Sequence, residues 1–460
     1  MITFFTITNT IDNLIIIVYN PNIRTSVLIF NFVISKVVID LSSQRWYFCI
    51  DMKCFFASVE CAERGLNPFT TNLVVTDKAR GKNAICLAIT PKMKSLGIKN
   101  RCRVSDIPNN VKYISAKPRM KNYIKYAADI YDIYLEFISP DDIHTYSIDE
   151  AFLDVTDYLK IYNITPYDFA NKLINLIAER LKIPSTVGIG TNLYLAKVAL
   201  DITAKKSPDH IGFLTEDLFK STLWHHQPLT DFWGIGSGLL KRFKELSIYN
   251  MEDITKTPSH LLYQHFGINA ELIIDHAYGR ETCLISDIKN YRVKSHSMCN
   301  SEILFNDYDF EKCKIVVSEH ALSLTHRLLR DKLITKGITL YIGYSNDNIS
   351  SSNGSIRLPY STNSFTVINE YLLKLYERIV SRTEPIRRVA IFFNDTIEEC
   401  AIGYDFFTDV DLLEREKKAE LAVINIKDKF GKNAVLRGID FLEGATAKER
   451  NKMIGGHNSE

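Results

Sequence analysis

The sequence predicts an α+β protein built from several modules, and three observations support this. At 460 residues the chain is too long for one compact core. Its first two hundred residues show the order strand, helix, strand, strand, helix, strand, which suggests a ferredoxin-like sheet interrupted by an insertion. A helical segment and a second set of alternating strand and helix signals then follow.

The first strand and the insertion come from residues 46–97. The run WYFCI, 46–50, is aromatic and β-favouring and ends at Asp51, and FFASVECAERG after it has apolar residues at helical spacing. Two strand-like runs, 72–75 and 84–89, lead into a charged helix that ends near Gly97. These elements predict a small inserted module.

The rest of the first sheet comes from residues 123–206. A helix over 123–137 precedes HTYSIDEAFLDVT, which alternates like a strand pair around a tight acidic turn. A second helix, 166–181, leads into STVGIGTN, a short strand that ends in glycines, and then into the helical LYLAKVALDITAKK. This part completes the ferredoxin-like order.

Three further segments complete the chain. The stretch FWGIGSGLLKRFKELSI predicts a glycine-bracketed turn between helices, and helical sequence continues to about Tyr278. After a polar connector, strand and helix signals alternate from 294 to about 393, and a charged helix is predicted over 410–430.

Composition narrows the class of protein. The net charge of only +2 means that any basic surface for nucleic acid must be local. Nine cysteines without a paired C-x-x-C fit neither a disulfide framework nor a zinc site, and a reducing cytoplasm is expected. Asn and Pro residues interrupt the apolar first forty residues, so we expect no membrane span there. We expect no signal peptide either, because the start has no Lys or Arg and no small-residue cleavage site follows a single apolar run.

Three carboxylates carry the first functional prediction. Asp51 follows a strand, and Asp149 and Glu150 lie in the hairpin, so they meet if these strands are neighbours. A lone acid at a strand end is usually a solvated turn residue, whereas a cluster of acids is costly unless a divalent cation compensates it. Hard oxygen ligands favour Mg²⁺, and two such ions can serve phosphoryl transfer.

The flanking residues resemble the signature motifs of one enzyme family. DMKCFFASVE from Asp51 and YSIDEAFLDV from Tyr146 are similar to the two motifs of the Y-family (translesion) DNA polymerases, and the chain resembles their UmuC-type branch, as found in Gram-positive bacteria and their mobile elements. The resemblance implies a template-directed DNA polymerase that extends a primer opposite damaged DNA, in DNA repair and the SOS response.

The resemblance also implies a right-hand polymerase fold with a ferredoxin-like palm, small fingers, a helix-hairpin-helix thumb and an α/β little finger. The expected boundaries are an N-terminal extension of unknown role at 1–40, a palm at 41–55 and 112–215, fingers at 56–111, a thumb at 216–285, a linker at 286–293, a little finger at 294–400 and a C-terminal tail at 401–460.

By the same resemblance, two Mg²⁺ ions are bound by Asp51, Asp149, Glu150 and the backbone carbonyl of Met52. Asp51, Asp149 and Glu150 are the expected catalytic residues. Glu150 has two alternative roles, since in related enzymes this residue either helps to bind metal or positions the primer 3′-hydroxyl.

Four residues are expected around the dNTP. Phe56 matches the family's steric gate, which leaves no room for a 2′-hydroxyl, while its neighbour Phe55 is assigned to the same site with the alternative that it belongs to the core. Lys94 falls where a basic residue contacts the triphosphate, and Lys205, preferred over Lys206, resembles a second triphosphate-binding lysine.

Primer–template DNA is the main expected partner. Gly234, Ile235 and Gly236 resemble a helix-hairpin-helix whose backbone N–H groups hold a DNA phosphate. GYDFF, Gly403 to Phe407, stands where relatives carry a clamp-binding peptide but lacks its Gln, so binding to a sliding clamp is left open. UmuD-like or RecA-like partners are equally open, and no membrane partner is expected.

Two other functions are compatible with part of this pattern. A nucleotide cyclase can also use a ferredoxin-like sheet with two metal-binding acids, but the helix-hairpin-helix and the little finger argue against it. A DNA-binding accessory protein descended from a polymerase would be expected to have lost an acid, and all three are present.

Overall fold

The computed structural model describes residues 3–5, 17–19, 44–77, 81, 83–293, 296–346, 348–399 and 409–460. The chain divides into two units, Met1–Gln44 and Arg45–Glu460. In the first unit, β1 (Thr3–Phe5) pairs antiparallel with β2 (Ile17–Tyr19). The rest of the predicted extension, and the clamp-like residues Gly403 to Phe407, lie outside the described residues.

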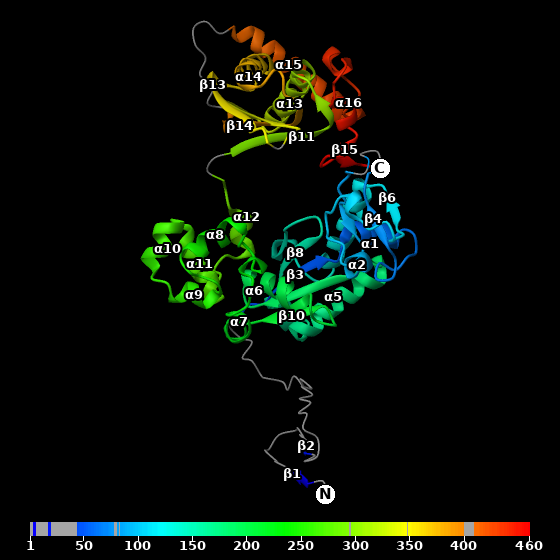
Figure 1. Cartoon of the computed structure of the whole chain (residues 1–460), viewed down its shortest axis with the longest axis vertical. Helices are drawn as coiled ribbons and strands as arrows, with labels where there is room; N and C mark the ends of the chain where they lie inside the picture. Colours follow the sequence, from blue (N-terminus) through cyan, green and yellow to red (C-terminus); the bar gives the residue numbers. More distant parts are fainter. Residues whose placement is uncertain are drawn as a thin grey trace. The chain divides into compact units, whose positions relative to one another are not determined.

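The second unit begins with a five-stranded sheet in the order β10-β9-β3-β8-β7. Its strands are β3 (Tyr47–Met52), β7 (Ile143–Thr145), β8 (Glu150–Asp154), β9 (Ser185–Gly190) and β10 (Ile211–Leu214). Figure 1 labels its strands β3, β8 and β10. β3 is central and antiparallel to both β8 and β9. With the helices between them, the first four of these strands in chain order have the predicted ferredoxin-like order.

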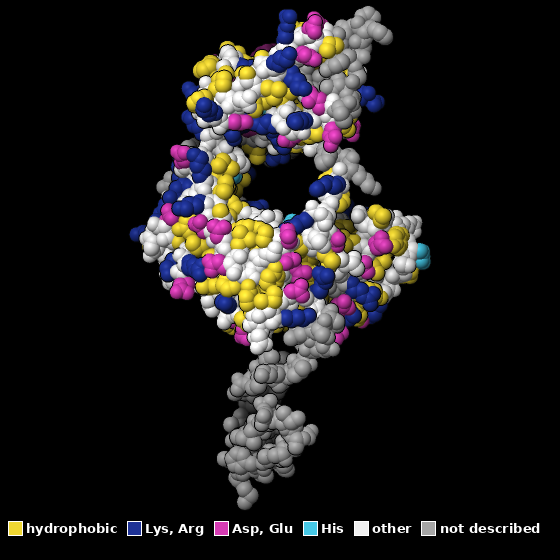
Figure 2. All heavy atoms as spheres, turned by 180° about the vertical axis from the view of Figure 1, so that it is seen from behind, with side chains coloured by type: hydrophobic (Ala, Val, Ile, Leu, Met, Phe, Trp, Pro, Cys, Tyr) yellow, Lys and Arg dark blue, Asp and Glu magenta, His cyan; other side chains and the backbone are white. Residues whose placement is uncertain are grey.

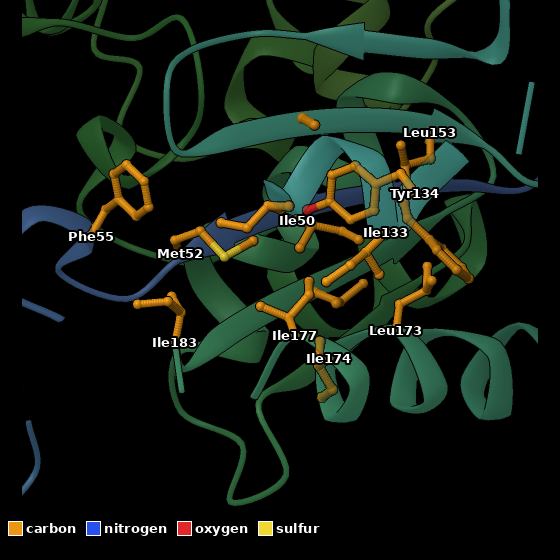
Figure 3. Close-up of a cluster of buried hydrophobic side chains, with 14 of the residues drawn as sticks. Ile50, Met52, Phe55, Ile133, Tyr134, Leu153, Leu173, Ile174, Ile177 and Ile183 are labelled. Atoms are coloured by element: carbon orange, nitrogen blue, oxygen red, sulfur yellow. The ribbon is translucent and has the colours of Figure 1, made fainter. Parts of the chain in front are cut away.

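Helices cover both faces of this sheet. α3 (Met120–Leu135) and α5 (Pro166–Leu181) pack on one face, where Ile50 and Met52 of β3 meet their apolar residues in one buried core (Figure 3). α6 (Leu193–Val198), continued by the π-helical turn η4 (Ala199–Ala204), packs on the other face against Tyr47 and Cys49. Alternate residues of β3 therefore point to different helices.

The insertion forms a small module of its own. It contains α1 (Phe55–Ala62), β4 (Leu73–Val75), β5 (Ala88–Ile89), α2 (Pro91–Ser95), η2 (Val104–Asp106) and β6 (Ile114–Ala116), with the strands in the order β5-β4-β6. The strand predicted over 84–89 is shorter, because Ile85 makes an isolated bridge with Arg103 and the amide of Cys86 donates to the carbonyl of Cys102.

A helical segment follows the sheet. It consists of α7 (Glu216–Leu223), the turn η5 (Leu229–Asp231), α8 (Ser237–Glu245), α9 (Met251–Lys256), α10 (Ser259–Phe266) and α11 (Asn269–Tyr278), which share one buried core. α12 (Ile285–Asn290) occupies much of the stretch predicted as a linker, and its Ile285 packs with Tyr47 and Cys49.

The second α+β module has a four-stranded antiparallel sheet in the order β11-β14-β12-β13. Its elements are β11 (His296–Tyr308), α13 (Phe310–Arg330), β12 (Leu333–Tyr344), β13 (Ser352–Thr362), α14 (Phe365–Ile379) and β14 (Ile386–Glu398). The two helices and the sheet enclose a separate buried core.

The C-terminal segment packs against this second module. It contains α15 (Val410–Phe430), η7 (Gly438–Phe441), α16 (Ala447–Arg450) and the short pair β15 (Met453–Ile454) and β16 (His457–Asn458). Arg450 donates to Glu302 over 2.9 Å, and the fully buried Glu319 accepts from the amides of Thr446 and Ala447. Among the described helices, none has an apolar stretch of the length that a bilayer requires.

Candidate active site

Asp51 and Glu150 lie directly opposite each other on neighbouring strands. Asp51 pairs with Glu150 in the register of β3 with β8, one pair beyond Ile50 and Ala151. Because side chains alternate along a strand, Asp51 and Glu150 share the sheet face on which Cys49 and Phe152 contact α6. The two carboxylates therefore face the α6 side of the sheet.

Asp149 joins them from the turn before β8. Its carbonyl accepts a hydrogen bond from the amide of Met52 at 2.9 Å, which ties the turn to the end of β3. Its carboxylate accepts from the Ser147 hydroxyl at 2.6 Å. The structure thus brings the three sequence-predicted acids to one edge of the sheet, together with Met52, whose side chain is buried in the core below.

The surroundings of Asp51 disfavour the charged form of its carboxyl group. Burial raises the pKa of Asp51 to about 7, and the charges of Asp149 and Glu150 add to the rise, while Lys205 and Lys197 oppose it. Like charges held together out of water favour the protonated form of one member. Burial, with the two neighbouring carboxylates, therefore outweighs the two lysines at Asp51.

As the side chains stand, no three acidic, histidine or cysteine groups of the described residues are gathered closely enough to hold a metal ion. The Asp149 carboxylate accepts from Ser147, and Lys197 holds one oxygen of Glu150. The backbone presents three carboxylates at one edge, and hard oxygen donors of this kind suit Mg²⁺. The chemistry of the donor set therefore fits a divalent cation.

Phe55 and Phe56 have different surroundings. Phe55 is 2% exposed and belongs to the core below the sheet, so the alternative reading of this residue matches its position. Phe56 is half-buried and stacks on Tyr123 of α3, with ring centroids 4.6 Å apart. The Tyr123 hydroxyl donates to Glu60 at 2.8 Å, so the surface behind the Phe56 ring is fixed.

The two predicted triphosphate lysines are both exposed. Lys94 lies on α2, where its charge acts on the thiol of Cys54, and burial raises the pKa of that thiol while Lys94 lowers it. Lys205 follows the π-helical turn and pairs with Asp201 at 2.8 Å. Lys205 also acts on the Asp51 carboxylate, which links it to the acidic edge.

The GIG stretch forms the turn before α8. Gly234 has a φ of +87°, a left-handed conformation that favours glycine, and Gly236 precedes the first residue of α8. Ile235 is half-buried and packs on the core of the helical segment. Trp233 donates to the hydroxyl of Tyr146 at 3.3 Å, so this turn contacts the hairpin that carries Asp149 and Glu150.

Sequence reasoning missed Lys197 and Cys49. Lys197 of α6 is buried and its Nζ lies 2.7 Å from Glu150 Oε1, while the Cys49 thiol donates to the same oxygen at 3.1 Å. A signal was present, because a lysine four residues before Asp201 lies on the same helix face and would be costly to bury without acids. Only the fold shows which acids these are.

Some charged side chains of the second module have partners within the protein, and others are exposed. Arg330 pairs with Asp428 of α15 at 2.5 Å and Arg327 donates to the carbonyl of Cys299, whereas Lys332 and Lys336 are exposed. On the face in Figure 2, basic and acidic side chains alternate across the described surface. This agrees with the small net charge of the chain.

Comparisons with known proteins place the chain in a family. Family models match at residues 50–201, for the impB/mucB/samB family, and at residues 295–400, for the C-terminal domain of that family. The Bacillus subtilis protein named for UV-damage repair, UvrX, is 30% identical over 89% of this chain and 97% of its own length. DNA polymerase IV 2 of Bacillus subtilis is 27% identical over 91% of this chain and 100% of its own length.

A solved structure has a similar fold. A Y-family DNA polymerase chimera of Dbh and Dpo4 superposes with a TM-score of 0.59 at 20% sequence identity, covering 77% of this chain and 99% of the chimera. The two family models fall on the two α+β modules described above. This chain belongs to the impB/mucB/samB family and has the α+β fold of the Y-family DNA polymerases.

Proposed function

We propose that this protein is a DNA-directed DNA polymerase of the translesion type, which adds deoxynucleotides to a primer end opposite damaged template DNA in repair and the SOS response. The observation that carries the proposal is the meeting of Asp51, Asp149 and Glu150 at one edge of a ferredoxin-like sheet. The relatives named as DNA polymerase IV and UvrX match nearly their full lengths to this chain, which supports the same activity here.

The family implies a divalent metal, and we assign two Mg²⁺ ions to this edge of the sheet. Asp51, Asp149, Glu150 and the carbonyl of Met52 would hold them. Such ions stabilise the attacking and leaving oxygens of an in-line phosphoryl displacement. The raised pKa of Asp51 supports this assignment, because a group that is costly to ionise alone gains most from a cation.

The dNTP would lie between this edge and the inserted module, which corresponds to the fingers. Phe56 would pack against the sugar and exclude a 2′-hydroxyl, and its stacking on Tyr123 would keep the ring in place. Lys94 and Lys205 would bind the triphosphate, since both are exposed cations. Lys205 acts on the Asp51 carboxylate, and Lys94 acts on Cys54, three residues along the chain from Asp51. Phe55 would support Phe56 from the core.

The thumb would hold the DNA through its backbone. The amides at Gly234, Ile235 and Gly236 precede α8, and the N-terminus of a helix favours a phosphate. We keep the domain boundaries that the sequence predicts, with the second α+β module as the little finger. We assign the protein to the cytoplasm, and a sliding clamp and UmuD-like or RecA-like proteins stay proposed partners.

Primer extension tests the proposal. Purified full-length protein with Mg²⁺ and dNTPs should extend a primer on an undamaged template and past an abasic site, and Asp149→Ala should not. The matched control is Asp157→Ala, which changes an exposed acid on α4 (Thr156–Ile161) away from this edge. Equal extension by wild type and Asp149→Ala would refute the proposed chemistry.

A further inference from the structure

We propose that Lys197 is a positioning residue that orients the Glu150 carboxylate, and that Asp201 links Lys197 to Lys205. The inference rests on the proposed function, because it concerns how two parts of that site are held. Three ion pairs join the four residues in one alternating chain of charges. They run from Glu150 to Lys197 at 2.7 Å, from Lys197 to Asp201 at 3.1 Å, and from Asp201 to Lys205 at 2.8 Å.

The Glu150 carboxylate is held through one of its oxygens. Lys197 Nζ and the Cys49 thiol both contact Oε1, and the Cys49 thiol comes from the central strand. Two contacts on one oxygen, from a helix and from a strand, restrict rotation of the carboxylate. In the proposed site, the other oxygen would be the one left to bind a metal ion or a primer hydroxyl.

Asp201 is bound at both of its oxygens. Its Oδ2 accepts from Lys197 and its Oδ1 accepts from Lys205, so it holds two lysines of the same helix face. The lysine side chains differ in exposure, with 9% of Lys197 and 52% of Lys205 accessible. Lys197 therefore contacts groups inside the protein, whereas Lys205 is accessible to a ligand.

The local fold lets α6 pack closely on the sheet. Gly188 and Gly190 of β9 allow the helix backbone to touch the sheet, because a Cβ at Gly190 would lie 2.1 Å from the amide nitrogen of Ala196. The turn that follows, Ala199–Ala204, is π-helical, and such turns are frequent at functional sites. Close packing brings Lys197 within reach of Glu150.

A buried lysine needs this arrangement to remain charged. Burial of an ammonium group is costly unless acids compensate it, and the carboxylates of Glu150 and Asp201 lie 2.7 Å and 3.1 Å from Lys197 Nζ. Lys197 in turn holds the Glu150 carboxylate in one orientation before any cation binds. Partners that orient a metal ligand typically change metal affinity or activity by about 10- to 100-fold when removed.

The first experiment measures the kinetics of Lys197→Met, which keeps the length of the side chain and removes its charge. We expect kcat for single-nucleotide insertion to fall by about 10- to 100-fold, with KM for dNTP changed by less than about threefold. In a Glu150→Gln background, Lys197→Met should lower the single-turnover rate by less than about threefold, because the carboxylate that Lys197 orients is absent. Lys160→Met, an exposed lysine of α4, is the matched control.

The second experiment needs no turnover. Mg²⁺ should raise the Tm of the DNA-free protein, and the rise should be smaller in Lys197→Met than in wild type or Lys160→Met, because Glu150 without its orienting partner binds the ion more weakly. A residue with only a structural role would lower the Tm equally with and without Mg²⁺. Asp201→Asn, at a partly exposed position, serves if Lys197→Met does not fold. It should raise KM for dNTP through Lys205.

Several results would overturn the inference. The first is a kcat of Lys197→Met within about twofold of wild type, and the second is a Lys197→Met effect on rate that is as large in the Glu150→Gln background as in the wild type. The others are a Mg²⁺-induced rise in Tm that is equal in Lys197→Met and wild type, and a wild-type KM for dNTP in Asp201→Asn. Asp149→Ala separates this failure from failure of the proposed function. If Asp149→Ala is inactive while Lys197→Met behaves as wild type, only the positioning role is lost.

Discussion

Removal of divalent cations should make the stability of this protein fall as the pH rises from about 4 to about 7, because of Asp51. Its pKa is raised from 3.8 to about 7, first by burial and then by Asp149 and Glu150. The folded chain thus holds this proton more tightly than the unfolded chain. The resulting stabilisation is complete below pH ~4 and is lost as the pH rises through ~7. At about 1.4 kcal/mol per pKa unit, the loss amounts to about 4 kcal/mol.

Urea unfolding in EDTA at pH 5 and pH 8 measures this loss. Asp51→Asn has no proton to release at this position. Because only about two of the pKa units lie between pH 5 and pH 7, the wild type should lose about 3 kcal/mol more than Asp51→Asn between the two pH values. Mg²⁺ at pH 8 should restore the wild type and have little effect on Asp51→Asn. A difference between the two proteins below about 1 kcal/mol would refute the assignment of this pH-dependent loss of stability to Asp51.

Three further changes test other parts of the structure. Phe56→Ala should raise the rNTP-to-dNTP ratio of kcat/KM by about tenfold or more, whereas Phe56→Tyr should not, and an unchanged ratio in Phe56→Ala would remove the steric gate. Gly190→Ala should cost at least about 1–3 kcal/mol of stability in urea unfolding, because its Cβ would overlap the backbone at Ala196. Arg450→Met should lower the free energy of unfolding by about 3–5 kcal/mol, because it leaves the buried Glu319 without its cation. It should also expose the C-terminal segment to limited proteolysis, and an unchanged cleavage pattern would contradict this.

Local signals made several elements predictable from the sequence. The helix predicted over 166–181 is α5, residue for residue, because Thr165 caps its first turn, Pro166 occupies its first position and Lys182 ends it in a left-handed conformation. The strand that ends at Asp51 was equally clear, since an apolar run followed by an acid marks the edge of a buried sheet. The meeting of the three acids then depended only on which strands are neighbours, and the ferredoxin-like order supplies that.

Other features depend on tertiary contacts and could not be predicted. The run 84–89 has strand-like composition, yet only Ala88–Ile89 pairs as a strand, because the residues before it pair with the loop at Cys102 and Arg103. The partner of Arg330 is equally distant, because α15 returns to the helix that carries Arg330 and supplies Asp428. In both cases the decisive partner lies far away along the chain, where periodicity carries no information.

The three acids differ in how the protein balances them, and the difference follows from the strands that carry them. Glu150 begins β8, within reach of Lys197, so a protein cation holds it. Asp149 precedes the strand and finds a hydroxyl partner in Ser147. Asp51 lies near the end of the central strand, and burial raises its pKa, with the charges of Asp149 and Glu150 adding to the rise against Lys205 and Lys197. The greatest electrostatic gain from a bound cation is therefore at Asp51, while Glu150 is already oriented before the cation arrives.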